Sequence, residues 1–113
     1  MRIFVFETNL MWSSRLMRTL RNLGHEPVLR TNMPENREGA QVAIVNLGDP
    51  TLDVRLLVPR LHALGVPVIA HAGHKEKELH ELGKQTGADI LATNSQLTFK
   101  LEELLAGIQA LDS

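Results

Sequence analysis

The chain has 113 residues and is 43% hydrophobic, so one domain can bury a full core without metal or disulfide support. Its 12 basic and 13 acidic residues give a formal net charge of -1, which offers no overall field for binding nucleic acid or an anionic membrane. The absence of cysteine excludes disulfides, thiol nucleophiles and cysteine-ligated metals.

The first element is a strand over Arg2–Phe6, where a β-branched and aromatic run is typical of a strand buried on both faces. A helix is expected over Ser13–Leu23, since its apolar residues recur at helical spacing and a glycine follows. Pro27–Thr31 is the second expected strand. Residues 32–40 are polar and rich in helix breakers, which predicts a loop with at most one helical turn.

The third strand is expected over Val42–Val45, and a helix should start at Asp49-Pro50, with the aspartate as its N-cap. Pro59 removes a backbone donor and should kink or split that helix. The remaining elements are a strand over Val66–Ala70, a charged helix over 74–87, a strand over Asp89–Ala92 and an amphipathic helix over Leu97–Leu111. Five strands alternating with helices predict an α/β domain with a doubly wound parallel sheet.

The amino-terminal segment has the pattern of a strand and lacks the charged start, apolar core and cleavage site of a signal peptide. No apolar run approaches the roughly 18 residues needed to cross a bilayer. We therefore expect one cytoplasmic domain over residues 1–113, with neither membrane nor nucleic acid among its partners.

In sheets of this kind, ligands bind at the carboxyl ends of the strands. The residues there are Glu7, Thr8, Asn9, Asn46, His71, Ala72, Thr93, Asn94 and Ser95. With these strand ends and the stretches IFVFETNLMWSSRLMRTLRNLGH and VPVIAHAGHKEKELHELGKQTGAD, nearly the whole chain resembles the CheY-like receiver domains of two-component response regulators. The resemblance implies strand order 2-1-3-4-5 and, from the short middle of the chain, a second helix that is shortened or missing.

The resemblance places the chemical residues of a receiver on positions that cannot perform its chemistry. The acidic metal-binding pair falls on Glu7 and Thr8, and the aspartate that accepts the phosphoryl group falls on Asn46. An amide is no phosphoryl acceptor, and one carboxylate is a poor magnesium site. The hydroxyl that reports phosphorylation in receivers falls on Ala72, which has none. The lysine after the fifth strand falls on Asn94 and the proline that follows it on Ser95, so the cation is missing as well. Asp49 is interpreted as a helix cap and not as a displaced acceptor.

Three histidines close in sequence, His71, His74 and His80, are a second candidate for a metal or ligand site. His71 and His74 could face one cavity together with Glu7 and there bind a metal, or make a contact with another ligand or a pH-sensitive contact. The alternative is that these histidines belong to a solvated loop. His74 and His80 are six apart, which does not bring them to one helix face. We favour the solvated loop and predict no metal and no cofactor. Trp12, the only tryptophan, is expected to seal the cleft in preference to anchoring a partner.

The leading functional hypothesis is a stand-alone pseudo-receiver: a non-enzymatic regulatory module that binds a protein partner or a second copy of itself. Receivers commonly use the face built by the fourth helix, the fifth strand and the fifth helix, so the resemblance points to Lys75–Gly83 and Leu97–Leu111. A second apolar strip is expected on the last helix because Phe99, Leu105 and Ala106 cannot all share its core stripe. The expected interface residues are Lys75, Lys77, His80, Leu91, Phe99 and Leu105.

Two alternatives stay open. A flavodoxin-like domain would hold a small ligand over Thr8, Asn9, Asn46, His71 and Asn94, although the first loop has no glycine for cradling phosphate. A small enzyme would use His71 or His74 as general base with Glu7 nearby.

Overall fold

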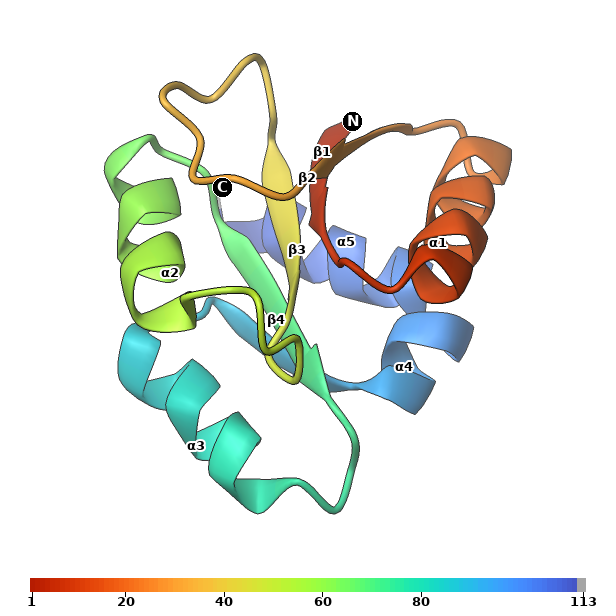
Figure 1. The fold of residues 1–113 in the computed structure, drawn as a ribbon. Coiled ribbons are helices and arrows are strands. Elements are labelled where there is room, and N and C mark those ends of the chain that lie inside the picture. The colour runs from red at the N-terminus through yellow and green to blue at the C-terminus, as the bar shows by residue number, and fades with distance from the viewer. Residues whose placement is uncertain (112–113) are drawn as a thin grey trace.

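A computed structural model describes residues 1–111 of the chain, which form a five-stranded parallel sheet with strand order β2-β1-β3-β4-β5 (Figure 1). The doubly wound fold and its strand order are confirmed. The strands are β1 (Arg2–Phe6), β2 (Glu26–Arg30), β3 (Val42–Asn46), β4 (Val68–Ala72) and β5 (Ile90–Thr93). The helices are α1 (Leu10–Asn22), α2 (Val54–Ala63), α3 (Lys77–Thr86), α4 (Asn94–Phe99) and α5 (Leu101–Leu111).

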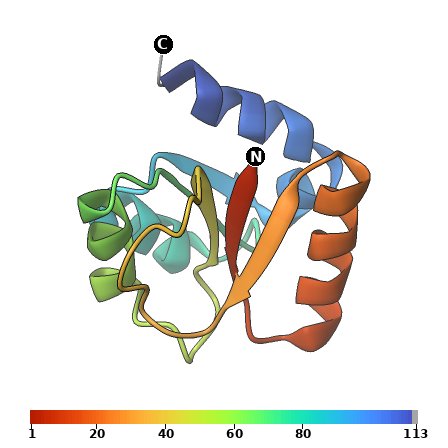
Figure 2. The ribbon, with the colours of Figure 1, turned by 90° about the horizontal axis from the view of Figure 1, so that it is seen from above.

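Helices cover both faces of the sheet, and each face has its own core. Alternate side chains of β1 point to opposite faces, so Phe4 and Phe6 pack with α2 while Ile3 and Val5 pack with α1 and α5. Seen from above, α1 and α5 lie on one side of the strands and α2 on the other (Figure 2). This burial on both faces explains why the strands are continuous apolar runs.

Residues 31–41 between β2 and β3 contain no helix, as the breaker-rich sequence predicted. The chain therefore crosses from one strand to the next by a loop. Among the described residues, no helix has the length and apolar character needed to span a bilayer.

Several boundaries differ from the prediction. Helix α1 begins at Leu10 and not at Ser13, because the Asn9 side chain caps it by accepting from the backbone N–H of Met11 and Trp12. Strand β2 begins and ends one residue earlier than expected, and β5 one residue later.

The boundary of β4 matters most for the site. Its predicted range, Val66–Ala70, is two residues too early. Val66 is buried, but the register with β3 runs only from Val68, opposite Ala43, to His71, opposite Asn46. His71 therefore belongs to the strand and is buried, whereas a solvated loop was predicted.

The segment after β3 also differs. Asp49-Pro50 does not start a helix: it forms a turn closed by the backbone bond from Leu52 to Asp49, and α2 begins only at Val54. Pro59 does not split α2, which runs through it to Ala63. The helix predicted over 74–87 is shorter as well and begins at Lys77.

The last predicted helix is divided in two at Lys100, whose backbone leaves the helical region at φ -128° and ψ 29°. Its N–H still bonds to Gln96, and its carbonyl accepts from Leu104 in α5. The predicted second apolar strip is wrong for Leu105, which is buried in the core, whereas Phe99 and Ala106 are exposed.

Candidate functional site

Polar side chains from three strand ends and one helix start meet at the carboxyl edge of the sheet. Glu7 follows β1, Asn46 ends β3, His71 lies near the end of β4 and Asn94 begins α4. The register pairs Asn46 directly with His71. All four line one cavity, so the expectation that these residues lie together holds.

Glu7 is a buried carboxylate held by two neutral donors. One oxygen accepts from the Asn9 backbone N–H at 3.0 Å, and the other accepts from the Asn46 amide at 2.6 Å. Within residues 1–111 no cation forms an ion pair with it. Each carboxylate oxygen thus accepts one hydrogen bond and keeps a further lone pair, and no cation of the described residues compensates the charge.

Asn46 links this carboxylate to the loop that follows β3. Its side-chain nitrogen donates to Glu7, and its side-chain oxygen accepts from the Gly48 N–H at 2.9 Å. Both ends of the amide are therefore engaged. At this position, the chain holds a neutral group that braces β1 against β3.

His71 is 7% exposed, and its Nδ1 lies 2.7 Å from the Asn94 Oδ1. Burial lowers the pKa of His71, and the Asn94 hydrogen bond and the charge of Glu7 oppose this only in part. Because an amide oxygen only accepts, Nδ1 carries the proton in the neutral ring. Nε2 is then an acceptor, and it has no hydrogen-bond partner among the described residues.

Asp49 is a second buried acid, 5% exposed, and it ties two loops together. One oxygen accepts from the backbone and hydroxyl of Thr8, at 2.8 and 2.6 Å, and the other from the backbone and hydroxyl of Thr51, at 2.9 and 2.7 Å. Burial alone would raise the pKa of Asp49, but these four hydrogen bonds outweigh it and lower the pKa. The carboxylate is fully used in this structural role.

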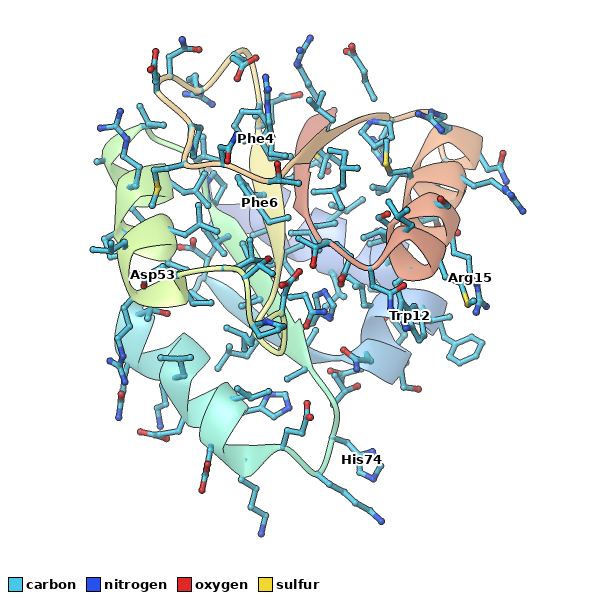
Figure 3. The ribbon with its side chains drawn as sticks, in the orientation of Figure 1. Phe4, Phe6, Trp12, Arg15, Asp53 and His74 are labelled. Atoms are coloured by element: carbon cyan, nitrogen blue, oxygen red, sulfur yellow. The ribbon has the colours of Figure 1, made fainter. Side chains whose placement is uncertain are left out.

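The cavity measures about 100 Å³ and has a polar floor and a largely apolar wall. Trp12, Arg15, Leu16 and Thr19 of α1 form one side, and Leu97 and Thr98 of α4 form the other. The Arg15 guanidinium lies over the Trp12 ring at 5.4 Å, and Figure 3 shows the two side chains together on α1. Trp12, which was predicted to seal the cleft, lines the cavity but remains 47% exposed.

The other predicted site residues lie outside the cavity. Thr8 bonds to Asp49, and Asn9 caps α1. Ala72 is buried on the opposite face of the sheet from His71, in the core that α2 covers. Ser95 is exposed on α4. His74 is exposed on the loop before α3, away from the cavity (Figure 3), so the predicted grouping of His71, His74 and Glu7 is wrong for His74.

The predicted interface residues are also dispersed. Lys75, Lys77 and Phe99 are exposed, whereas Leu91 is half-buried against the core. His80 is half-buried, and its Nε2 lies 3.0 Å from the Gly73 carbonyl. In residues 1–111, no group of three or more histidines and acids is placed to hold a metal ion.

Sequence reasoning missed Arg15, Leu16, Thr19, Leu97 and Thr98 as cavity residues and Asp49 as a bridge. Arg15, Leu16 and Thr19 could have been found from their spacing to Trp12, which places all four residues on one helix surface. The Asp49 bridge to Thr8 joins residues 41 apart, and nothing in the local pattern indicates it.

Solved structures of response regulators have the same fold. A two-component response regulator from Clostridium difficile matches with a TM-score of 0.77, 13% identity and coverage of 99% of this chain and 98% of that chain. A CheY-like receiver domain protein from Methanospirillum hungatei matches with a TM-score of 0.75, 19% identity and 96% coverage of both chains.

A structure described as a family of redox sensors in the streptococci that evolved from two-component response regulators gives a TM-score of 0.77 at 12% identity. That match covers 98% of this chain and 52% of the other. No protein-family model matches the sequence, and no curated protein matches it at a significant level. At these identities the comparisons show that the chain has the fold of a receiver domain.

The Asp49 bridge is tested by Asp49→Asn. The substitution replaces one of the two carboxylate oxygens by an amide nitrogen, which cannot accept the hydrogen bonds from the threonine on that side. The free energy of unfolding in urea should therefore fall by about 2 kcal/mol or more. The matched control is Asp53→Asn, because Asp53 is exposed and caps α2 without a side-chain hydrogen bond; its effect should stay within about 0.5 kcal/mol. Equal losses in the two variants would contradict the bridge.

Stability should also fall on acidification. The pKa of His71 in the folded chain is below the ordinary value of 6.5. The contribution of the neutral ring to the free energy of unfolding is therefore complete above that pH and is lost as the pH falls through the lowered pKa. His25, whose pKa is lowered by burial and by the nearby amino terminus, acts in the same direction. Urea unfolding from about pH 7 to pH 5 should show a shallower slope for His71→Gln than for the native chain. His74→Gln, at an exposed position, is the control, and an unchanged slope in His71→Gln would contradict this assignment.

Proposed function

We propose that this chain is a regulatory module with the receiver fold that works without accepting a phosphoryl group. The observation that carries the proposal is the 2.6 Å hydrogen bond between Asn46 and Glu7. The residue at the acceptor position is an amide, and it donates to the one buried carboxylate that could help to hold a metal ion. Phosphoryl transfer depends on a nucleophile, a metal ion and a cation in position. Here the nucleophile and cation positions hold the amides Asn46 and Asn94, and the metal-binding pair is reduced to Glu7 beside the neutral Thr8.

The other acid near the site does not replace the missing acceptor. Asp49 is buried and accepts four hydrogen bonds, so it is neither accessible nor free to attack a phosphoryl donor. Asn94, at the position of the lysine, is neutral and is bonded to His71. We expect no catalysis from this site: His71 has a free Nε2, but no nucleophile stands next to it among the described residues.

A flavodoxin-like role is less well supported. A cavity of about 100 Å³ is smaller than the roughly 300 Å³ at which pockets for drug-sized ligands begin. The site can accept a compact molecule, and a flavin nucleotide would not fit inside it.

The module is proposed to act through a protein partner, which we take to be a second copy of the chain, since symmetric homodimers are the commonest soluble assemblies. Phe99 is 81% exposed at the end of α4, and large exposed aromatic side chains are typical anchors of interfaces. Lys77, exposed at the first position of α3, and Lys75, exposed in the loop just before it, would supply charges at the rim.

Incubation with acetyl phosphate, or with beryllofluoride and magnesium, should leave the protein unmodified and its spectra unchanged. Mass spectrometry measures the first result and NMR the second. Asn46→Asp alone should not restore switching, because Thr8, Ala72 and Asn94 still leave the metal and the charge unaccounted for. A stoichiometric acid-labile phosphate on the native chain would overturn the proposal.

Self-association should weaken in Phe99→Ser. Light scattering over a wide concentration range should show a dimer for the native chain and a dissociation constant raised by about tenfold or more for the variant, as expected for loss of an aromatic anchor. Leu56→Ser is the matched control, because Leu56 is 62% exposed on α2.

Equal weakening in the two variants would remove Phe99 from the interface, and a strictly monomeric native chain would move the proposal to a different protein partner. The pair Lys75→Glu and Lys77→Glu should change the association rate and its salt dependence.

A further inference from the structure

Two buried groups at the floor of the cavity have unused capacity to accept hydrogen bonds. The Glu7 carboxylate is 5% exposed and has no cation beside it within residues 1–111. The His71 imidazole is 7% exposed, and its Nε2 has no partner among those residues. A buried charge without a cation beside it carries a free-energy cost. A ligand with a positive charge and N–H donors would relieve that cost and could also donate to the His71 Nε2.

A positive charge stands on the cavity wall formed by α1. Arg15 is exposed, and within the described part of the chain its guanidinium contacts the Trp12 ring but no carboxylate (Figure 3). Its five N–H donors therefore remain available to an anion. The lining thus has a negative group at the buried floor and a positive group at an exposed position.

We propose that the cavity binds a small aminocarboxylate, with its ammonium group on Glu7 and His71 and its carboxylate on Arg15. The three N–H donors of an ammonium group match acceptors that are already in place, and the methylene carbons would contact Trp12, Leu16 and Leu97. A zwitterion adds no net charge to a lining in which Glu7 and Arg15 balance. The inference does not rest on partner binding or on the absence of phosphorylation.

The size of the cavity limits the ligand. About 100 Å³ corresponds to roughly three water molecules at about 30 Å³ each, so the ligand has only a few heavy atoms. Nucleotides and flavins are too large. A divalent metal is disfavoured because, among residues 1–111, Glu7 is the only carboxylate in the lining, and hard cations take several oxygen ligands.

The test is an NMR titration of the full chain with glycine, β-alanine and γ-aminobutyrate, observing the His71 ring and the Trp12 indole. Each compound is compared with the amine and the carboxylate that remain when one of its charged groups is removed: methylammonium and acetate, ethylammonium and propionate, propylammonium and butyrate. At least one aminocarboxylate should bind about tenfold more tightly than both of its counterparts, since each charged hydrogen-bonded contact contributes roughly that factor.

Two variants assign the contacts. Arg15→Gln should weaken binding of the aminocarboxylate about tenfold and leave binding of its amine counterpart unchanged. Arg18→Gln, at an exposed position of α1 outside the cavity, should change the binding of neither compound. Glu7→Gln should abolish binding of both. If Glu7→Gln does not fold, the Arg15 and Arg18 pair still decides the result, because both side chains are exposed.

The proposal is overturned if no aminocarboxylate moves the His71 and Trp12 signals. It is also overturned if each amine binds as tightly as its aminocarboxylate, or if Arg18→Gln weakens binding as much as Arg15→Gln. Acetyl phosphate reactivity is a separate measurement, so a failure here and a failure of the proposed function are distinguishable.

Discussion

The contact between Asn46 and Glu7 is the constraint on which the rest of the site depends. It joins the ends of two neighbouring strands through a buried carboxylate and a neutral amide. An aspartate at position 46 would place two carboxylates within hydrogen-bond distance, and like charges so close are tolerated only with a cation or a shared proton. The amide removes that need. The strand ends are therefore held together without a metal ion, and the loops above them can be fixed by other means.

Asp49 is the means by which those loops are fixed. It accepts from Thr8 on one side and from Thr51 on the other, so the loop after β1 and the loop after β3 are held by one side chain. In a site that used acids for metal binding, such a carboxylate would have to stay accessible. Here its pKa is lowered by hydrogen bonds within the chain, which keeps it ionised and engaged over the physiological range. Asp49 thus stabilises the structure at this edge of the sheet.

The fold could be predicted from the sequence because buried parallel strands are apolar runs and helices repeat their apolar residues every three to four positions. The site could be predicted only in part. Glu7, Asn46 and Asn94 follow strand ends directly, whereas the burial of His71 depends on β4 beginning at Val68 and not at Val66. The break at Lys100 has no proline or glycine beside it, and its neighbours Leu97 and Leu101 continue one buried stripe. Apolar periodicity therefore gave no sign of two helices.

That break has a physical consequence for how the site and the surface are connected. Because α4 ends at Phe99, it is a short element that carries cavity residues on one side and an exposed aromatic residue at its end. Its start is fixed by the Thr93 capping box and by the hydrogen bond from His71 to Asn94, while Leu97 anchors it to the core. The buried His71 ring and the start of α4 are thus joined by one hydrogen bond. The six residues of α4 therefore include Asn94 and Leu97, which line the cavity, and Phe99, which is exposed.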